Sequence, residues 1–304
     1  MSLVSIQMCC FNGEKHLRES IESILGQTHT DWELIFWDNQ STDLSASIVK
    51  EYQDPRIKYH LAPVHTNLGG GRAKSWPLLT GKFIAFLDVD DTWEPDRLEL
   101  QIPLFNDPEV SIVAGNVLWK NDKHEELIYS KWYPQEGYVT QNLLYHYFLS
   151  LPSVTLRRSA VEKLEKAFDP EFSHISDFDL FVRVSAAGKL AIVKKKIANW
   201  RVDMNSLSWA QRTKFYSEHI DWIECYKHTN WFRPYRKALP SMLLSTIARK
   251  LYFAIIKNEY KHSESTGFMK FTDRAAFCAF QILKLRPLRW LVELHFKTKT
   301  QKWV

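Results

Sequence analysis

The stretch FIAFLDVDDTW, residues 83–93, contains the clearest strand signal in the chain. Its first five residues are apolar, and Asp88, Asp90 and Asp91 follow them almost without interruption. Because side chains alternate along a strand, Asp88 and Asp90 are expected to point the same way. Carboxylates on one face repel each other unless a cation lies between them, and Mg²⁺ prefers such oxygen ligands. The stretch is therefore compatible with a metal site, but taken alone so short a motif more often forms a solvated turn in which Asp90 or Asp91 caps the next helix.

Strand and helix signals alternate on the amino-terminal side of this stretch. Further strands are predicted at LVSIQMCC (3–10), WELIFWDN (32–39) and IKYHLA (57–62). Helices are predicted after FNGE, at residues 45–52, and directly after the Gly-rich turn NLGGGR. This alternation predicts an α/β unit with a mostly parallel sheet. In such sheets ligands bind beyond the carboxyl ends of the strands, where the acidic and Gly-rich turns fall.

The last third of the chain has a different character. Gly267 is the only glycine after about residue 210, and the spacing of apolar residues predicts helices in HIDWIECYKH, ALPSMLLSTIARKLYFAIIK and RAAFCAFQILKL. We therefore predict an α/β domain over residues 1–210 and a helical region over 211–304.

Composition narrows the class of protein further. The 304 residues are 45% hydrophobic and 25% charged, which excludes a disordered or collagen-like chain. The four cysteines have neither the spacing of a zinc site nor that of a disulfide framework, and they favour a reduced, cytoplasmic setting. The amino terminus lacks the basic segment of a signal peptide, and no run of ~18 apolar residues predicts a membrane span.

The positive charge is concentrated near the carboxyl terminus. Residues 270–304 contain eight Lys/Arg and only two Asp/Glu, whereas the formal charge of the whole chain is +5. A basic tail on a nearly neutral body indicates one local anionic partner rather than a nucleic-acid groove. Because Trp and Phe are mixed with the basic residues, the tail could lie on an anionic membrane surface at the inner face of the cell membrane. The alternative is a pair of helices packed on the catalytic domain.

Several segments match, in order, the motifs of a known enzyme family. They are Phe11-Asn12, Ser23 to Thr28, Glu33 to Ile35, Asp38-Asn39 with Ser41 to Asp43, and NLGGG with GKFIAFLDVDDTWEPDRL. Over roughly residues 3–210 the sequence resembles family 2 glycosyltransferases, which have the GT-A fold. The resemblance implies an inverting transferase that uses a divalent metal (Mg²⁺ or Mn²⁺) and moves a sugar from a nucleotide-diphosphate sugar to a hydroxyl. DVDDTWEPDRLELQ and SDFDLFVR resemble bacterial enzymes of cell-surface polysaccharide or lipopolysaccharide assembly, which implies a glycan or lipid-linked acceptor.

The resemblance also implies which residues bind the donor. Phe11 occupies the position of an aromatic residue near the nucleotide base, although it could equally be a core residue. Asp38 and Asn39 fall where the family contacts uracil or ribose. Arg72 is the candidate for the diphosphate side, together with the metal-binding Asp88.

The same resemblance assigns the metal and the base. Asp88, Asp90 and Asp203 are the candidate metal ligands, with Asp203 at a position where the family often has His. Arg201 either neutralises the diphosphate or pairs with Asp203. Asp177 occupies the general-base position, and its alternative role is a helix-start carboxylate held by the helix dipole.

Asp179 and Arg183 are spaced i,i+4 on the helix that begins near Asp177. This spacing predicts a surface ion pair, so replacing Asp179 is expected to have a mild effect.

Two other functions remain open at this stage. A nucleotidyltransferase on a similar sheet would release pyrophosphate, but the Gly-rich turn lacks the spacing of a triphosphate-binding loop. A catalytically inactive sugar-nucleotide or glycan-binding module would bind without turnover. The joint presence of Asp88, Asp90 and Asp177 favours the enzyme.

Overall fold

The computed structural model describes residues 2–121, 124–130, 132–202 and 210–257. It divides into two units, Met1–Ser206 and Leu207–Val304. The basic tail at 270–304 lies outside the described residues.

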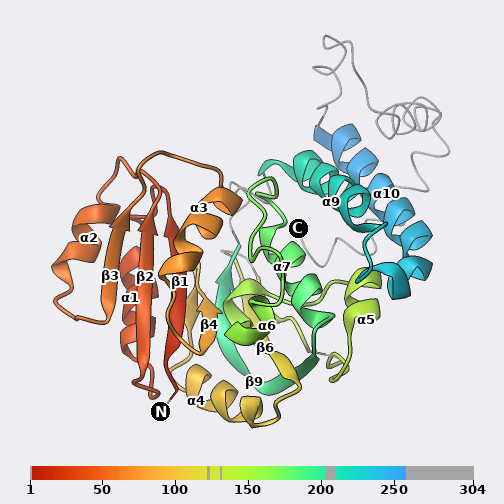
Figure 1. Cartoon of the computed structure of the whole chain (residues 1–304). Helices are drawn as coiled ribbons and strands as arrows, with labels where there is room; N and C mark the ends of the chain where they lie inside the picture. Colours follow the sequence, from red (N-terminus) through yellow and green to blue (C-terminus); the bar gives the residue numbers. More distant parts are fainter. Residues whose placement is uncertain (1, 122–123, 131, 203–209, 258–304) are drawn as a thin grey trace. The chain divides into compact units, whose positions relative to one another are not determined.

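The strands of the first unit form one curled, mixed sheet in the order β3-β2-β1-β4-β8-β6-β9-β5, with β7 paired to β6 (Figure 1). They are β1 (Val4–Cys10), β2 (Trp32–Asp38), β3 (Ile57–Leu61), β4 (Phe83–Phe86), β5 (Thr92–Trp93), β6 (Val110–Lys120), β7 (Glu125–Leu127), β8 (Thr155–Arg157) and β9 (Lys189–Arg201). β1 is parallel to both β2 and β4, β2 is parallel to β3, and β6 is parallel to β9. The strands predicted upstream of the acidic stretch are therefore confirmed.

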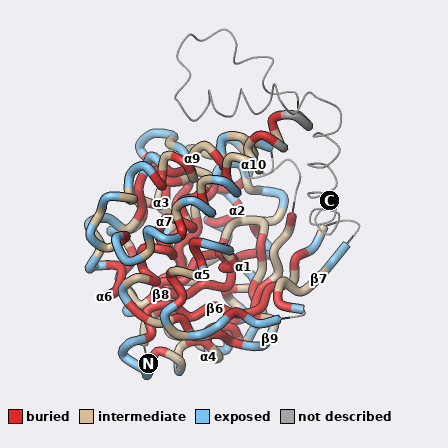
Figure 2. The backbone as a smooth tube through the Cα atoms, turned by 90° about the vertical axis from the view of Figure 1, so that its right-hand side faces the viewer, coloured by how far each residue is buried: buried red, intermediate tan, exposed pale blue. Residues whose placement is uncertain are grey.

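Helices connect these strands and cover the sheet (Figure 1). They are α1 (Leu17–Leu25), α2 (Ser45–Glu51), α3 (Leu68–Ser75), α4 (Arg97–Gln101), α5 (Thr140–Tyr145), α6 (Arg158–Val161) and α7 (Ser176–Ser185), with short 3₁₀ turns at Trp76–Leu78, Ile102–Asn106 and Leu151–Ser153. Alternate residues of β1, β2 and β4 belong to the main apolar core, and the strands of the sheet are largely buried (Figure 2). Burial of this apolar surface holds the carboxyl ends of the strands at fixed positions.

The acidic stretch does not continue as a strand. β4 ends at Phe86, and the amide of Asp91 donates to the carbonyl of Asp88 at 3.2 Å, which closes a turn. The expectation that the strand continues through Asp88 and Asp90 is therefore wrong, and the turn rather than the pleat of a strand sets the directions of their side chains.

The NLGGGR segment is not a turn before a helix but the start of α3 itself. Asn67 is the N-cap, and its Oδ1 accepts a hydrogen bond from the amide of Gly70 at 2.7 Å. A Cβ at residue 69 would lie only 2.1 Å from the carbonyl oxygen of Phe172. Glycine is therefore required there by a close approach of two backbone segments, and this explains glycine in a helix without a phosphate-binding loop.

The second unit contains α9 (Arg212–Tyr226), a 3₁₀ turn at Arg233–Ala238 and α10 (Leu239–Lys257). Tyr216 and Phe253 stack between the two helices with ring centroids 5.8 Å apart. The first two helices predicted for this region are confirmed, and the third lies outside the described residues. Within the described part of the chain, no helix is both long and apolar enough to cross a bilayer.

Candidate active site

The acidic turn lies at the carboxyl end of β4. Asp88 and Asp90 are partly exposed, whereas Asp91 is buried. Burial, together with the charges of Asp90 and Asp88, raises the pKa of Asp91 well above its usual range. Asp91 accepts a hydrogen bond from the amide of Arg201 at 2.9 Å, so its carboxyl braces the end of β9. This leaves Asp88 and Asp90 as the carboxylates of the turn that face solvent.

Arg201 is held against the acidic turn by its side chain as well. Its Nε donates to the carbonyl of Asp90 at 3.1 Å, and its guanidinium pairs with Glu19 of α1 at 2.6 Å. Asp203, the partner and metal ligand suggested by the sequence, lies outside the described residues. In the described part, Arg201 therefore ties β9 to the turn and to the first turn of α1.

Arg72 connects the acidic turn with the start of α7. Its guanidinium is buried, pairs with Asp88 at 3.0 Å and donates to the hydroxyl of Ser176 at 2.8 Å. Burial disfavours the charged form of Arg72, but the carboxylates of Asp88 and Asp177 outweigh it and raise the pKa of the guanidinium. α3, β4 and α7 are thus joined at one point by a permanently charged side chain.

Asp177 lies in the first turn of α7 and is half-buried. Burial raises its pKa above the usual range, while the positive charge of Arg72 opposes the rise. The hydroxyl of Tyr147 donates to Asp177 Oδ2 at 3.3 Å, and the Tyr147 ring packs edge-on against Phe178 at 5.1 Å. A carboxylate with a raised pKa, held by a hydrogen bond and close to a metal-type acidic turn, is suited to accept a proton.

Asp179, two residues further on, has a different role. Its side chain is fully buried and forms an ion pair with Arg183, which also donates to the carbonyls of Lys166 and Ala167. The predicted ion pair between Asp179 and Arg183 is confirmed, but its predicted position at the surface is wrong because the pair is buried. Removing one partner of such a pair leaves a buried charge uncompensated, which typically costs about 3–5 kcal/mol.

The side chains assigned to the nucleotide lie at the ends of β1 and β2. Phe11 is 51% exposed, with its ring centroid 4.4 Å from that of His65, so the alternative that Phe11 is a core residue is wrong. Asp38 is buried and accepts hydrogen bonds from the Tyr59 hydroxyl and the Ser41 amide.

Asn39 is also buried, and its side-chain amide forms two hydrogen bonds with the backbone of Thr66. Its Nδ2 donates to the carbonyl of Thr66 at 2.6 Å, and its Oδ1 accepts from the amide of Thr66 at 3.0 Å. Asn39 therefore fixes the loop that carries His65 against the end of β2.

A cysteine also lies beside Arg72. Burial raises the pKa of the Cys9 thiol to about 11, and Cys9 Sγ is 3.7 Å from the hydroxyl of Ser75. A thiol with such a pKa is protonated at neutral pH, so it does not supply the thiolate that a cysteine nucleophile requires. The ionisable group suited to chemistry here is the carboxylate of Asp177.

The acidic turn can be tested for its fit to a divalent cation. Within the described ranges, no three His, Cys, Asp or Glu side chains gather as a metal cluster. Asp88 and Asp90 offer two carboxylates, which matches the way Mg²⁺ binds through one or two carboxylates together with substrate phosphates. The turn therefore fits a cation that is shared with a phosphorylated ligand better than a closed structural metal site.

Sequence reasoning did not find Tyr147 and Ser176. Ser176 precedes Asp177 directly, so the position of a helix start was a usable signal. Tyr147 follows α5 by two residues and is brought to Asp177 only by tertiary packing, for which the sequence contains no local signal.

Known proteins resemble this chain in sequence and in structure. The model of glycosyl transferase family 2 matches residues 5–164, which is more than half of the chain. The chain belongs to glycosyl transferase family 2. Asp177 and Arg201 lie beyond the matched segment, so the position of these two residues in this glycosyltransferase is known from the geometry above.

Two relatives extend the similarity beyond that segment. A UDP-Glc:α-D-GlcNAc-diphosphoundecaprenol β-1,3-glucosyltransferase of Escherichia coli is 29% identical over 208 residues, covering 68% of this chain and 79% of its own length. An uncharacterized glycosyltransferase of Methanocaldococcus jannaschii is 31% identical over 227 residues, covering 71% and 77%. This glycosyltransferase is therefore similar to its relatives over most of their length.

A solved structure shows the fold. The mannosyltransferase PcManGT of Pyrobaculum calidifontis, in complex with GDP-Man and Mn²⁺, has a TM-score of 0.62 at 13% identity and covers 99% of this chain and 87% of its own. The glycosyltransferase has the GT-A fold predicted from its sequence.

Proposed function

We propose that this glycosyltransferase moves a sugar, with inversion, from a nucleotide-diphosphate sugar to a hydroxyl of a glycan or lipid-linked acceptor. The observation that carries the proposal is the position of Arg72, whose guanidinium joins Asp88 of the acidic turn to the helix start that holds Asp177. A donor-side acidic turn and a base on the acceptor side are the two parts that such a transfer needs.

The chemistry follows from these side chains. The acceptor oxygen attacks the anomeric carbon, its proton passes to the carboxylate of Asp177, and the nucleoside diphosphate leaves. A single displacement of this kind inverts the configuration at the anomeric carbon. Asp88 and Asp90 would hold a divalent cation, Mg²⁺ or Mn²⁺, which neutralises charge on the leaving diphosphate. The positive charge of Arg72 offsets the repulsion between the carboxylates of Asp88 and Asp177, and its guanidinium binds Asp88 and Ser176 directly.

The donor's nucleotide is expected at the exposed ring of Phe11 and the neighbouring end of β2. Phe11 offers a flat apolar face on which a base can stack. Asp38 and Asn39 are buried at the same end of β2. A base that displaces Thr66 from Asn39 would find both a donor and an acceptor there.

The name of one relative supports the proposed lipid-linked acceptor. The E. coli relative acts on a diphosphoundecaprenol-linked sugar by its name, and a lipid-linked acceptor of cell-surface polysaccharide or lipopolysaccharide synthesis suits a peripheral position at the membrane. The contact with an anionic membrane surface through residues 270–304 remains part of this proposal.

A donor panel tests the function. The full chain, with Mg²⁺ or Mn²⁺, is incubated with UDP-glucose, UDP-N-acetylglucosamine and GDP-mannose, and the nucleoside diphosphate released is measured. We expect at least one donor to release its nucleoside diphosphate in a cation-dependent way. Release of pyrophosphate alone would indicate a nucleotidyltransferase, and tight binding without release from any donor would indicate an inactive binding module.

Replacing Tyr147 by Phe should move the acid limb of the kcat/KM–pH profile to higher pH. The Tyr147 hydroxyl donates to Asp177 and favours its ionised form, so its loss raises the pKa of a base that is active only when ionised. Because burial already raises this pKa, the wild-type limb itself should lie above the usual range of an aspartate.

Tyr129→Phe is the matched control for this measurement. The Tyr129 hydroxyl donates to the carbonyl of Phe148 at 2.8 Å, in the same segment but without contact to Asp177. Its loss should cost about 1 kcal/mol of stability and leave the acid limb in place. Equal displacement of the limb in both variants, or in neither, would contradict the role of Tyr147.

A further inference from the structure

A polar pocket lies on the side of the acidic turn formed by β5, β6 and β9. Its volume is about 280 Å³, and its lining includes Asp90 and Glu19 together with three basic side chains, Lys120, Lys196 and Arg201. All of these residues belong to the first unit. The pocket has room for a phosphoryl group but not for a large apolar ligand, since drug-sized ligands usually occupy about 300–1,000 Å³.

The sheet brings the basic side chains together. Lys120 ends β6 and is paired in register with Arg201, which ends β9, while Lys196 lies beside a register shift in the same ladder. Thr92 of β5 pairs with Asn199, so β5 closes the edge next to Asp90. The positive charge thus comes from the carboxyl ends of two parallel strands, which meet at one edge of the sheet.

The three cations differ in how far they are neutralised. Lys196 pairs with Glu94 at 2.7 Å, and Arg201 pairs with Glu19 at 2.6 Å. Lys120 is exposed, and among the residues that the structure describes no carboxylate lies within ion-pair distance of its ammonium. Among the described side chains of the pocket, Lys120 is therefore the cation that no carboxylate within ion-pair distance neutralises, which makes it available to a ligand.

The pocket is separate from the proposed nucleotide site, which consists of Phe11, Asp38 and Asn39 at the ends of β1 and β2. The pocket lies at the ends of β6 and β9. β2 and β6 are four strands apart in the sheet order, roughly 19 Å at the usual spacing of neighbouring strands. β4, which leads into the acidic turn, lies between β2 and β6 in the sheet order, and Asp90 of that turn is part of the pocket lining. A ligand in the pocket would thus approach the acidic turn from the side opposite the nucleotide.

We infer that this pocket is a subsite for a phosphoryl group of the acceptor. Lys120 is the main residue that binds the phosphoryl oxygens, and Lys196 and Arg201 line the pocket beside it. This inference rests on the proposed function, because it names the acceptor class of the same enzyme: a sugar carried on a phosphate or diphosphate. Oxygen-rich anions are the ligands that such a set of ammonium and guanidinium groups recognises. The Arg201 side chain also donates to the backbone carbonyl of Asp90 in the acidic turn. A phosphoryl group bound by Arg201 would therefore lie next to the proposed reaction site.

The same chemistry could come from the donor, whose diphosphate also carries phosphoryl groups. The experiment therefore fills the donor site first. The full chain is saturated with Mg²⁺ and with UDP or GDP, whichever binds more tightly, and is then titrated calorimetrically with phenoxyundecyl diphosphate. Phenoxyundecanol, which has the same apolar part without the phosphates, is titrated in parallel.

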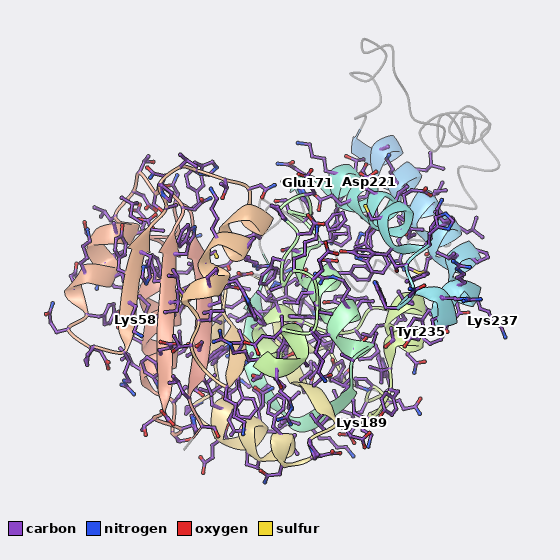
Figure 3. The ribbon with its side chains drawn as sticks, viewed as in Figure 1. Lys58, Glu171, Lys189, Asp221, Tyr235 and Lys237 are labelled. Carbon is purple, nitrogen blue, oxygen red and sulfur yellow. The ribbon has the colours of Figure 1, made fainter. Side chains whose placement is uncertain are left out.

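Lys120→Gln is the test variant and Lys189→Gln its matched control. Lys189 lies at the start of β9, at the opposite end of the same β6–β9 ladder and at the opposite edge of the sheet (Figure 3). We expect wild type and Lys189→Gln to bind the diphosphate alike. Lys120→Gln should bind it about tenfold more weakly or worse, the size of one lost charge-assisted hydrogen bond.

Four results would overturn the inference. They are no binding of the diphosphate once the donor site is filled, equal affinity in wild type and Lys120→Gln, an equal loss in both lysine variants, and binding of phenoxyundecanol as tight as that of the diphosphate. The titration needs no turnover, so it fails or succeeds independently of the donor panel, which tests the proposed function itself.

Discussion

Replacing Asp177 by Asn is expected to lower turnover by ~100-fold or more while leaving donor affinity within about twofold, because general-base catalysis usually contributes at least that much. Asparagine keeps the size of the side chain and can still accept the hydrogen bond from Tyr147, but it cannot take a proton from the acceptor. The start of α7 should stay in place, since Arg72 holds it through Ser176 rather than through Asp177. Turnover and donor titration on the same preparation measure the two effects.

Asp107→Asn provides the control, because Asp107 is an exposed aspartate in the turn before β6, at the opposite edge of the sheet. It should leave turnover unchanged. Asp179→Asn is not a suitable control, since it disrupts the buried ion pair with Arg183 and lowers stability instead. Turnover of Asp177→Asn within tenfold of wild type, with normal melting behaviour, would remove Asp177 from the proposed mechanism.

The fold was accessible from the sequence because its signals are local. Apolar runs such as Val4–Cys10 and Trp32–Asp38 are long enough to predict buried strands, and their alternation with amphipathic helices predicts the parallel part of the sheet. The exact end of β4 was not accessible, because the apolar run continues to Leu87 while the turn is set by the hydrogen bond between Asp91 and Asp88. The helical state of the three glycines in α3 was likewise hidden, since glycine usually indicates a turn.

The candidate site was accessible only in part. Asp88, Asp90 and Asp177 are named by motifs, but a motif does not say which charges face each other. Asp179 is buried together with Arg183, which also binds the distant carbonyls of Lys166 and Ala167, and the contact of Tyr147 with Asp177 joins segments 30 residues apart. The pairing of Lys120 with Arg201 depends on the register of two strands that are distant in sequence. Such contacts are tertiary, and one sequence contains no local signal for them.

Replacing Asp90 by Ala should abolish transfer, with turnover at least ~1,000-fold lower, if the cation bound there supplies the several kcal/mol expected of metal-assisted departure of a leaving group. Asp90 is a cleaner probe of the cation than Asp88. Removing Asp88 would leave the buried guanidinium of Arg72 without its ion-pair partner, so a loss of activity could reflect a loss of folding. The contact that Arg201 makes with Asp90 uses the backbone carbonyl, which alanine retains.

Four measurements decide this last prediction. Thermal unfolding of Asp90→Ala should match that of Asp107→Ala within a few degrees, which shows that the turn still folds. The wild type should bind its donor more tightly with Mg²⁺ or Mn²⁺ than with a chelator, and Asp90→Ala should lose this difference. Because Asp90 also lines the pocket beside Lys120, the same variant should keep most of its affinity for phenoxyundecyl diphosphate, since an acidic side chain repels that ligand. Cation-independent turnover in Asp90→Ala would show that Asp90 holds no cation that the transfer needs.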